Sequence, residues 1–363
     1  MNYRIIFLCC ILFCSYGCKQ TYQEESESVL KFVRTDFRET IYLNEPKEII
    51  IEDLLNVAVL RVMRDSILVV GNQPNCEYLL ELYSLNNICK PLKQLVRKGT
   101  GPSEMISCVL GLYGNDDRNF LLTDYNTGIC NVVNMNVLLK DSPFEPLYKF
   151  KYSSEISDNS NVCMVNDSSY VGYNRWYLPN SKFSSIGQPL SYYKCDANEE
   201  KIEVSPYYMD IVNGCGLLYN YVKGQIWGIE NHRDLIHIYD DSLQLINTLM
   251  GPDHYLPQYE DEPLDPQNVV VRFADRRNYR TYCDYYLTSK HVYLVYAGTD
   301  SYDDMNLNPV EIFKLDHEGN LLCNYKMDRY VYSISLDKEE QNLYCLSRQS
   351  VMEPPLILKY RLK

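Results

Sequence analysis

The sequence predicts an all-β protein, a six-bladed β-propeller built from four-stranded antiparallel blades. Three observations support this prediction. The chain of 363 residues contains 34 tyrosines, a residue type that favours strands. Short strand-like runs recur about every 55 residues, which is the spacing of a supersecondary repeat. The 3.6-residue periodicity of amphipathic helices is nearly absent.

The recurring runs predict the second and third strands of each blade. The first set of apolar runs begins at Ile67, Phe120, Tyr170, Ile226, Val292 and Leu343. Each is followed by an alternating run, at Leu80–Leu85, Cys130–Val133, Ser191–Cys195, Ile236–Tyr239, Glu311–Leu315 and Leu356–Tyr360. Asn, Asp, Ser and Gly bound many of these runs, which is typical of antiparallel strands joined by tight turns. A row of β-sandwiches is the alternative, but the chain shows no linker between repeats.

The last repeat ends at Lys363 after about three strands, so we expect the ring to close with a strand from the other terminus. Val29–Val33 and Thr40–Leu43 are the two candidates for this closing strand.

The first 17 residues have the layout of a secretory signal. Arg4 supplies a positive charge, and Ile5–Phe13 forms a nine-residue apolar run, too short to span a bilayer as a helix. Cys18 then follows small residues and resembles the cysteine of a bacterial lipobox, with Ser15 where the usual pattern has Leu. That resemblance implies cleavage before Cys18 and a lipid on its thiol. The alternative is an ordinary cleaved signal that leaves a free thiol.

Residues 18–28 are polar and acidic and are expected to tether the anchor to a propeller formed by residues 29–363. No later apolar run approaches 18 residues, so we expect membrane contact through the lipid anchor only. Lys19 after the lipidated cysteine and the acidic tether favour the outer membrane.

The charge and cysteine content exclude some classes of function. The 35 basic and 48 acidic residues give a net charge of −13, which argues against a nucleic-acid partner held by a broad basic surface. Ten cysteines remain beyond Cys18. They are scattered, several within apolar strand patterns, and no Cys-x-x-Cys pair exists for zinc or redox work. We therefore expect mostly free, buried thiols and no metal site built on cysteine.

A short motif, Gly99-Thr100-Gly101-Pro102-Ser103-Glu104, lies between the first and second blades. Gly99, Gly101 and Pro102 suit a tight crossover, and Glu104 is expected to cap neighbouring backbone amides, a catalytic carboxylate being the alternative. The motif and the layout of the whole chain resemble the TolB-like six-bladed propeller lipoproteins of anaerobic Gram-negative gut bacteria. The resemblance implies an exported propeller and supplies no catalytic residues to carry over.

Propeller topology predicts which loops share a face. If strands A to D run outward from the channel, the B–C loops and the D–A crossovers emerge together. This places the following segments on one face: Gly99–Glu104, Tyr173–Pro189, Gly251–Arg280 and Ala297–Pro309. Long loops on a rigid scaffold commonly carry function, so this face is the expected binding surface.

Two groups of residues in these loops are candidate ligand contacts. Arg175, Trp176 and Tyr177 offer a cation and two aromatic rings, suited to a sugar or peptide. A second, basic group suits a carboxylate or phosphate and comprises Arg272, Arg276, Arg277 and Arg280. The alternative is that these arginines pair with the nearby acidic residues 260–262.

No cofactor is predicted. Asp300, Asp303 and Asp304, with two nearby asparagines, are weak candidates for Ca²⁺, but they lack the spacing of an EF-hand loop. A solvated acidic loop is the alternative explanation of these residues.

The chain lacks the Gly-x-Ser-x-Gly, His-Glu-x-x-His and P-loop motifs of common enzyme classes. We therefore expect an exported, non-catalytic binding or interaction module for a glycan, a peptide or an envelope protein. One alternative is a propeller hydrolase or lyase with a channel-centred site that uses a metal ion, for which Asp124 is a channel-facing candidate. The other is a structural component of an envelope assembly.

Overall fold

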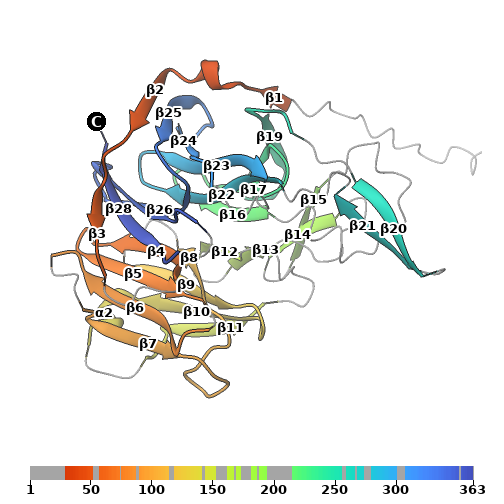
Figure 1. Cartoon of the computed structure of the whole chain (residues 1–363). Coiled ribbons are helices and arrows are strands. Elements are labelled where there is room, and N and C mark those ends of the chain that lie inside the picture. The colour runs from red at the N-terminus through yellow and green to blue at the C-terminus, as the bar shows by residue number, and fades with distance from the viewer. Residues whose placement is uncertain are drawn as a thin grey trace, which may run out of the picture.

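The structure is a computed structural model in which strands dominate the described residues and the helical segments among them are short (Figure 1). It describes residues 29–51, 57–73, 75–86, 90–113, 118–140, 144–152, 162–166, 169–172, 181–185, 188–193, 215–255, 259–265, 268–273, 279–300, 307–350 and 353–362. The signal, lipid and tether predictions for residues 1–28 lie outside the described residues.

The architecture is an all-β propeller with four-stranded antiparallel blades. The first sheet contains β4 (Val57–Met63), β5 (Ile67–Asn72), β6 (Tyr78–Ser84) and β7 (Lys93–Arg97). The second contains β8 (Val109–Leu112), β9 (Asn119–Asp124), β10 (Ile129–Asn134) and β11 (Tyr148–Lys151), with a short helix, α2 (Met135–Leu138), after β10. The third contains β12 (Cys163–Asn166), β13 (Ser169–Gly172), β14 (Ser181–Ser185) and β15 (Gln188–Tyr193).

Two of the remaining sheets carry a fifth strand. The fourth sheet contains β16 (Cys215–Asn220), β17 (Gln225–Glu230), β18 (Leu235–Tyr239), β19 (Leu245–Met250) and β1 (Val29–Lys31). The fifth contains β22 (Tyr279–Leu287), β23 (Val292–Asp300), β24 (Glu311–Leu315), β25 (Leu321–Met327) and β2 (Glu39–Leu43). The sixth contains β26 (Val331–Leu336), β27 (Asn342–Ser347), β28 (Leu356–Arg361) and β3 (Lys47–Ile49). A separate hairpin pairs β20 (Tyr259–Asp265) with β21 (Asn268–Phe273).

The predicted second strands are confirmed as β5, β9, β13, β17, β23 and β27. The third strand of the third sheet is a correction, because Ser181–Ser185 takes that place and Ser191–Cys195 overlaps the fourth strand, β15. The prediction missed β14 because its sequence, SKFSS, lacks the apolar alternation that marked the other third strands.

The closing strand is also a correction. The ring does borrow a strand from the N-terminal region, but that strand is β3, which pairs antiparallel with β28. The two predicted candidates, β1 and β2, pair parallel with β19 and β25 instead, and they add a fifth, outer strand to two sheets. Residues 29–49 therefore form a strap along the outer edges of three consecutive sheets (Figure 1).

The first strands of the sheets surround the channel. β4 contacts β8 and β26, β22 contacts β16 and β26, and β12 contacts β8 and β16. Apolar side chains fill the spaces between neighbouring sheets. Val69 and Leu80 pack with Leu110 and Phe120 between the first two sheets, for example. Burial of these faces against one another holds the ring together.

The strand directions define two faces. The A–B and C–D turns emerge on one, which we name the turn face. The B–C turns and D–A crossovers emerge on the other, which we name the crossover face. The predicted loop-rich surface was assigned to the crossover face. For Tyr173–Pro189 this is a correction, because the segment contains β14 and the C–D turn that follows it, and that turn emerges on the turn face.

Eight cysteines lie in the described part of the chain, and six of them are buried. This agrees with the strand-pattern prediction for those positions. Burial raises the pKa of the thiols of Cys108, Cys130 and Cys163 to about 12, so they behave as small apolar side chains. Within the described residues, no helix is both long and apolar enough to cross a membrane.

Candidate functional site

A cavity of about 310 Å³ opens at the turn-face end of the channel. Its walls come from the first, second, fourth, fifth and sixth sheets, so no single repeat contains the site. Its polar and aromatic lining includes Arg61, Arg64, Tyr113, Tyr221, Tyr286, Ser289 and Lys338. The volume lies at the lower end of the range of about 300–1,000 Å³ that is typical of small-molecule pockets.

Arg61 belongs to β4, within the otherwise apolar run VAVLRVM, and is 6% exposed. Its Nη1 donates to the carbonyls of Leu60 at 2.8 Å and of Ile334 at 3.1 Å. Its two Nη atoms face the two carboxylate oxygens of Asp284 at 3.5 and 3.4 Å. Its Nε–H has no hydrogen-bond acceptor. Arg61 thus links three inner strands and keeps one donor unsatisfied beside the cavity.

Two tyrosines form the aromatic part of the wall. The guanidinium carbon of Arg61 lies 5.8 Å from the centroid of the Tyr286 ring. The hydroxyl of Tyr286 donates to the carbonyl of Leu336 at 3.5 Å. Tyr221 follows β16 and is half-buried, and this burial raises the pKa of its hydroxyl to about 12. Tyr221 is therefore neutral near pH 7, which suits contact with a ligand ring.

The charged residues at the rim of the cavity differ in the hydrogen bonds that they form. Asp65 Oδ1 accepts the backbone N–H of Lys338 at 2.8 Å. Asp337 Oδ1 accepts the backbone N–H of Gln341 at 2.7 Å and of Asn342 at 3.1 Å. The two carboxylates thus stabilise turns, whereas Arg64 donates to the neutral side chain of Asn136 and the Lys338 side chain is exposed.

A buried carboxylate joins the fifth and sixth sheets near the cavity. Glu340 is in the β26–β27 turn and accepts from the hydroxyl of Tyr293 at 2.9 Å, from Nδ1 of His291 at 2.7 Å and from the hydroxyl of Thr288. The Nζ of Lys314 lies 3.4 Å away. Burial opposes ionisation, but the bonds from His291 and Thr288 outweigh it and lower the pKa of Glu340 from 4.5 to about 2. Glu340 therefore stays ionised and fixes the turn next to the cavity.

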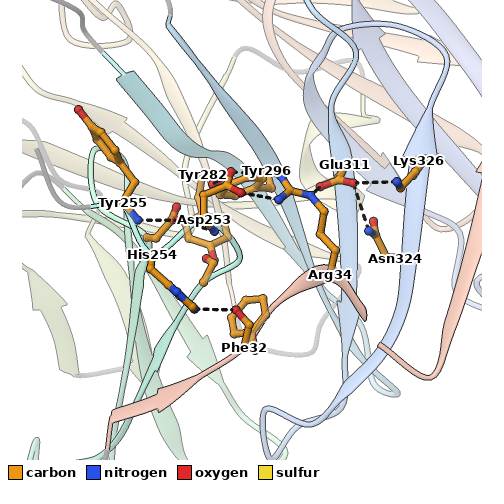
Figure 2. Close-up of polar contacts among 12 residues, drawn as sticks. Phe32, Arg34, Asp253, His254, Tyr255, Tyr282, Tyr296, Glu311, Asn324 and Lys326 are labelled. Atoms are coloured by element: carbon orange, nitrogen blue, oxygen red, sulfur yellow. Dashed lines mark hydrogen bonds and ion pairs between the residues drawn. The ribbon is translucent and has the colours of Figure 1, made fainter. Parts of the chain in front are cut away.

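A second network on the crossover side attaches the strap (Figure 2). Arg34 donates through Nε to Glu311 at 2.6 Å and through Nη2 to Asp253 at 3.1 Å, and Asp253 also accepts the hydroxyl of Tyr296 at 2.9 Å. Nε2 of His254 lies 3.0 Å from the carbonyl oxygen of Phe32. These contacts join the N-terminal region to the fourth and fifth sheets and are structural.

Asp234 anchors the segment after β19 that contains Asp253. Its Oδ2 accepts the backbone N–H groups of Asp253 at 2.9 Å and Tyr255 at 3.0 Å. Burial raises the pKa of Asp234 to about 6. Asp124, the channel-facing candidate, has a similar position in the second sheet, where it accepts Ile106 N–H at 2.9 Å and the Ser107 hydroxyl at 3.0 Å. It anchors a crossover and is not part of the cavity wall.

The Gly99–Glu104 motif forms the turn between β7 and β8. The carboxylate of Glu104 accepts the backbone N–H of Gly101 at 2.9 Å. A Cβ on Gly99 would lie 1.9 Å from Glu104 Oε2, and a Cβ on Gly101 would lie 3.0 Å from it. The two glycines thus make room for the carboxylate, and Pro102 lies in the same turn.

Most of the other sequence candidates lie outside the described residues. Arg175, Trp176, Tyr177, Arg276 and Arg277 are among them, as are Asp303 and Asp304. Arg272 is opposite Glu260 in the register of the β20–β21 hairpin, and Arg280 is an exposed residue at the start of β22. The described residues contain no group of His, Cys, Asp or Glu side chains arranged to hold a metal ion.

Sequence reasoning missed the turn-face cavity. In the sequence, Arg61 was the residue that could have indicated this cavity, because a charged residue inside an apolar strand usually has a specific partner or role. Tyr286, Tyr221 and Lys338 are far apart in sequence, and their convergence depends on ring closure.

Comparisons with known proteins agree with this architecture. The model of a family described as TolB-like 6-blade propeller-like matches residues 59–339. A solved structure of a DUF4221-family protein from Bacteroides vulgatus is similar, with a TM-score of 0.56 and 10% identity, covering 88% of this chain and 97% of that chain. A Bacteroides fragilis protein, provisionally described as exported, has a TM-score of 0.52 and 12% identity, covering 93% of this chain and 100% of that chain. At such low identity the similarity shows the fold alone. No curated protein matches the chain.

Proposed function

Because the chain belongs to the TolB-like six-bladed propeller-like family, we propose that it is an exported propeller that acts as a non-catalytic binding module. The family match agrees with the resemblance seen in the Gly99–Glu104 motif. We assign one blade to each of the six sheets, with β3 completing the last. The partner classes we consider are a glycan, a peptide and an envelope protein.

The turn-face cavity is the observation that carries this proposal. Five sheets contribute to it, and a half-buried aromatic wall and a buried arginine lie next to the half-buried Arg64 and the exposed Lys338. The rigid strands behind it fix these groups in place, which lowers the entropic cost of binding. The acidic residues of its described lining, Asp65 and Asp337, accept backbone N–H groups, and this arrangement favours binding over acid–base catalysis.

The cellular location is part of the same proposal. We place the chain in the cell envelope, at the outer membrane, anchored by a lipid on Cys18. The acidic segment that follows is long enough to hold the propeller away from the bilayer surface. A propeller presented in this way can meet ligands with either face.

The test is a thermal-shift screen of glycans and peptides on the purified protein, repeated on two matched variants. Ser289→Trp puts a bulky ring at the cavity, whereas Ser350→Trp makes the same change at the crossover-face turn after β27. A ligand that binds the native state must raise the melting temperature. We expect Ser289→Trp to abolish the shift and Ser350→Trp to retain it. A shift that survives Ser289→Trp would contradict the assignment of the cavity.

A further inference from the structure

We propose that the turn-face cavity binds a compact acidic sugar, with its ring against the tyrosines and its carboxylate toward Arg61, Arg64 and Lys338. This inference rests on the proposed function, since it names the ligand class for the same cavity. Three features of the described residues support it: the two wall cations that form no ion pair, the unsatisfied Nε–H of Arg61 and the occupied backbone of the surrounding turns.

The described lining of the cavity carries two cations that form no ion pair, Arg64 and Lys338. Asp65 and Asp337 each accept backbone N–H groups through Oδ1 at 2.7–3.1 Å, so hydrogen bonds hold both carboxylates in the turns. Within the described part of the chain, neither Arg64 nor Lys338 forms an ion pair with a carboxylate, and Lys338 is exposed. An anionic ligand would gain attraction from both cations without displacing an existing ion pair. This is notable in a chain whose net charge is −13.

Arg61 adds a directional contact. Asp284 faces the end of the guanidinium formed by Nη1 and Nη2, at 3.4 and 3.5 Å, which leaves the Nε edge without an acceptor. A buried donor on a charged group destabilises the structure when it has no partner. The Nε edge of arginine matches the two oxygens of a carboxylate. An acid group that enters the cavity would therefore supply the missing acceptor.

The surrounding turns favour a sugar over a peptide. Their backbone donors are occupied: Ser66 N–H bonds to Met63 O at 3.3 Å, Thr288 N–H to His291 O at 2.9 Å and Lys338 N–H to Asp65. A peptide that binds as an added strand needs free backbone groups along its length. A sugar needs ring faces and side-chain donors, and Tyr221, Tyr286 and Ser289 offer these. The cavity of about 310 Å³ suits a compact ligand of this kind.

Titration calorimetry on the purified protein tests this inference with D-glucuronate and D-galacturonate. D-Glucose and D-galactose are the neutral counterparts, and N-acetyl-dialanine is a peptide carboxylate. We expect each uronate to bind at least ten-fold more tightly than its neutral sugar, with an affinity that falls as salt rises. The double variant Arg64→Gln/Lys338→Gln should weaken uronate binding at least ten-fold. Lys290→Gln, which removes an exposed cation on the same face outside the cavity wall, should leave it unchanged.

Equal affinity for neutral and acidic sugars would overturn the inference, as would wild-type uronate binding by the double variant. Binding of the peptide carboxylate without the uronates would also overturn it. The results distinguish failure of the acidic-sugar inference from failure of the proposed binding function of the cavity. If the uronates do not bind but Ser289→Trp abolishes binding of another ligand, the cavity stands and the acidic-sugar assignment fails. If Ser289→Trp leaves every binding event intact, both fail.

Discussion

Replacement of Glu340 by glutamine should destabilise the protein in a pH-dependent way. The carboxylate is 5% exposed and accepts hydrogen bonds from Thr288, His291 and Tyr293 across the boundary between two sheets. Its pKa falls from 4.5 to about 2 on folding. At about 1.4 kcal/mol per pKa unit this difference corresponds to about 3 kcal/mol, of which solvent screening leaves about 2 kcal/mol.

The sign of the pH dependence follows from the direction of this change. A carboxyl group whose pKa is lower in the folded state stabilises the protein fully above its unfolded pKa of 4.5. That contribution is lost as the pH falls from 4.5 toward 2. The Glu340→Gln variant lacks the titrating group, so the difference between wild type and variant should be largest near pH 7 and should shrink below pH 4.

Urea unfolding of both proteins at several pH values between 7 and 3 measures this difference. Glu339→Gln is the matched control, because Glu339 is exposed and pairs with the exposed Lys290 at 2.9 Å. We expect that control to change stability by less than about 0.5 kcal/mol. A Glu340→Gln effect below that value, or one that is constant between pH 7 and pH 3, would refute the reasoning.

Three further predictions concern the strap, the crossover motif and the anchor. Arg34→Ala should lower the free energy of unfolding by about 1–2 kcal/mol and speed amide exchange in residues 29–43, because it removes the hydrogen bonds that attach the strap. Arg38 is exposed, and Arg38→Ala should change neither quantity. Gly99→Ala should lower the free energy of unfolding by about 1 kcal/mol, because the added Cβ displaces the Glu104 carboxylate. A double-mutant cycle measured by thermal unfolding should show that most of this loss disappears when Glu104 is also replaced by alanine. Cys18→Ser should release the protein from the membrane fraction and abolish incorporation of a labelled fatty acid, and retention of the label would disprove lipidation at that cysteine.

The sequence was most informative where local pattern decides structure. The second strands were predictable because each is a short apolar run bounded by polar turns, as in Ile67–Asn72 and Gln225–Glu230. The crossover at Gly99–Glu104 was recognisable because its residue types suit a tight turn.

Features that depend on non-local pairing were harder to predict. β1, β2 and β3 are all short segments, and only packing against the last three sheets decides which of them closes the ring. The cavity could not be predicted either, because its walls come from turns of five different sheets. Arg61 was visible as a charge in an apolar strand, but its partner Asp284 is more than 200 residues away.

Hydrogen–deuterium exchange with and without a bound ligand reports which face of the propeller the ligand covers. The ligand is the strongest binder from the thermal-shift screen. We expect slowed exchange in the turns around residues 61–66, 286–291 and 336–341, which surround the turn-face cavity. Slowed exchange confined to the crossover face, at residues 99–105 and 251–255, would contradict it.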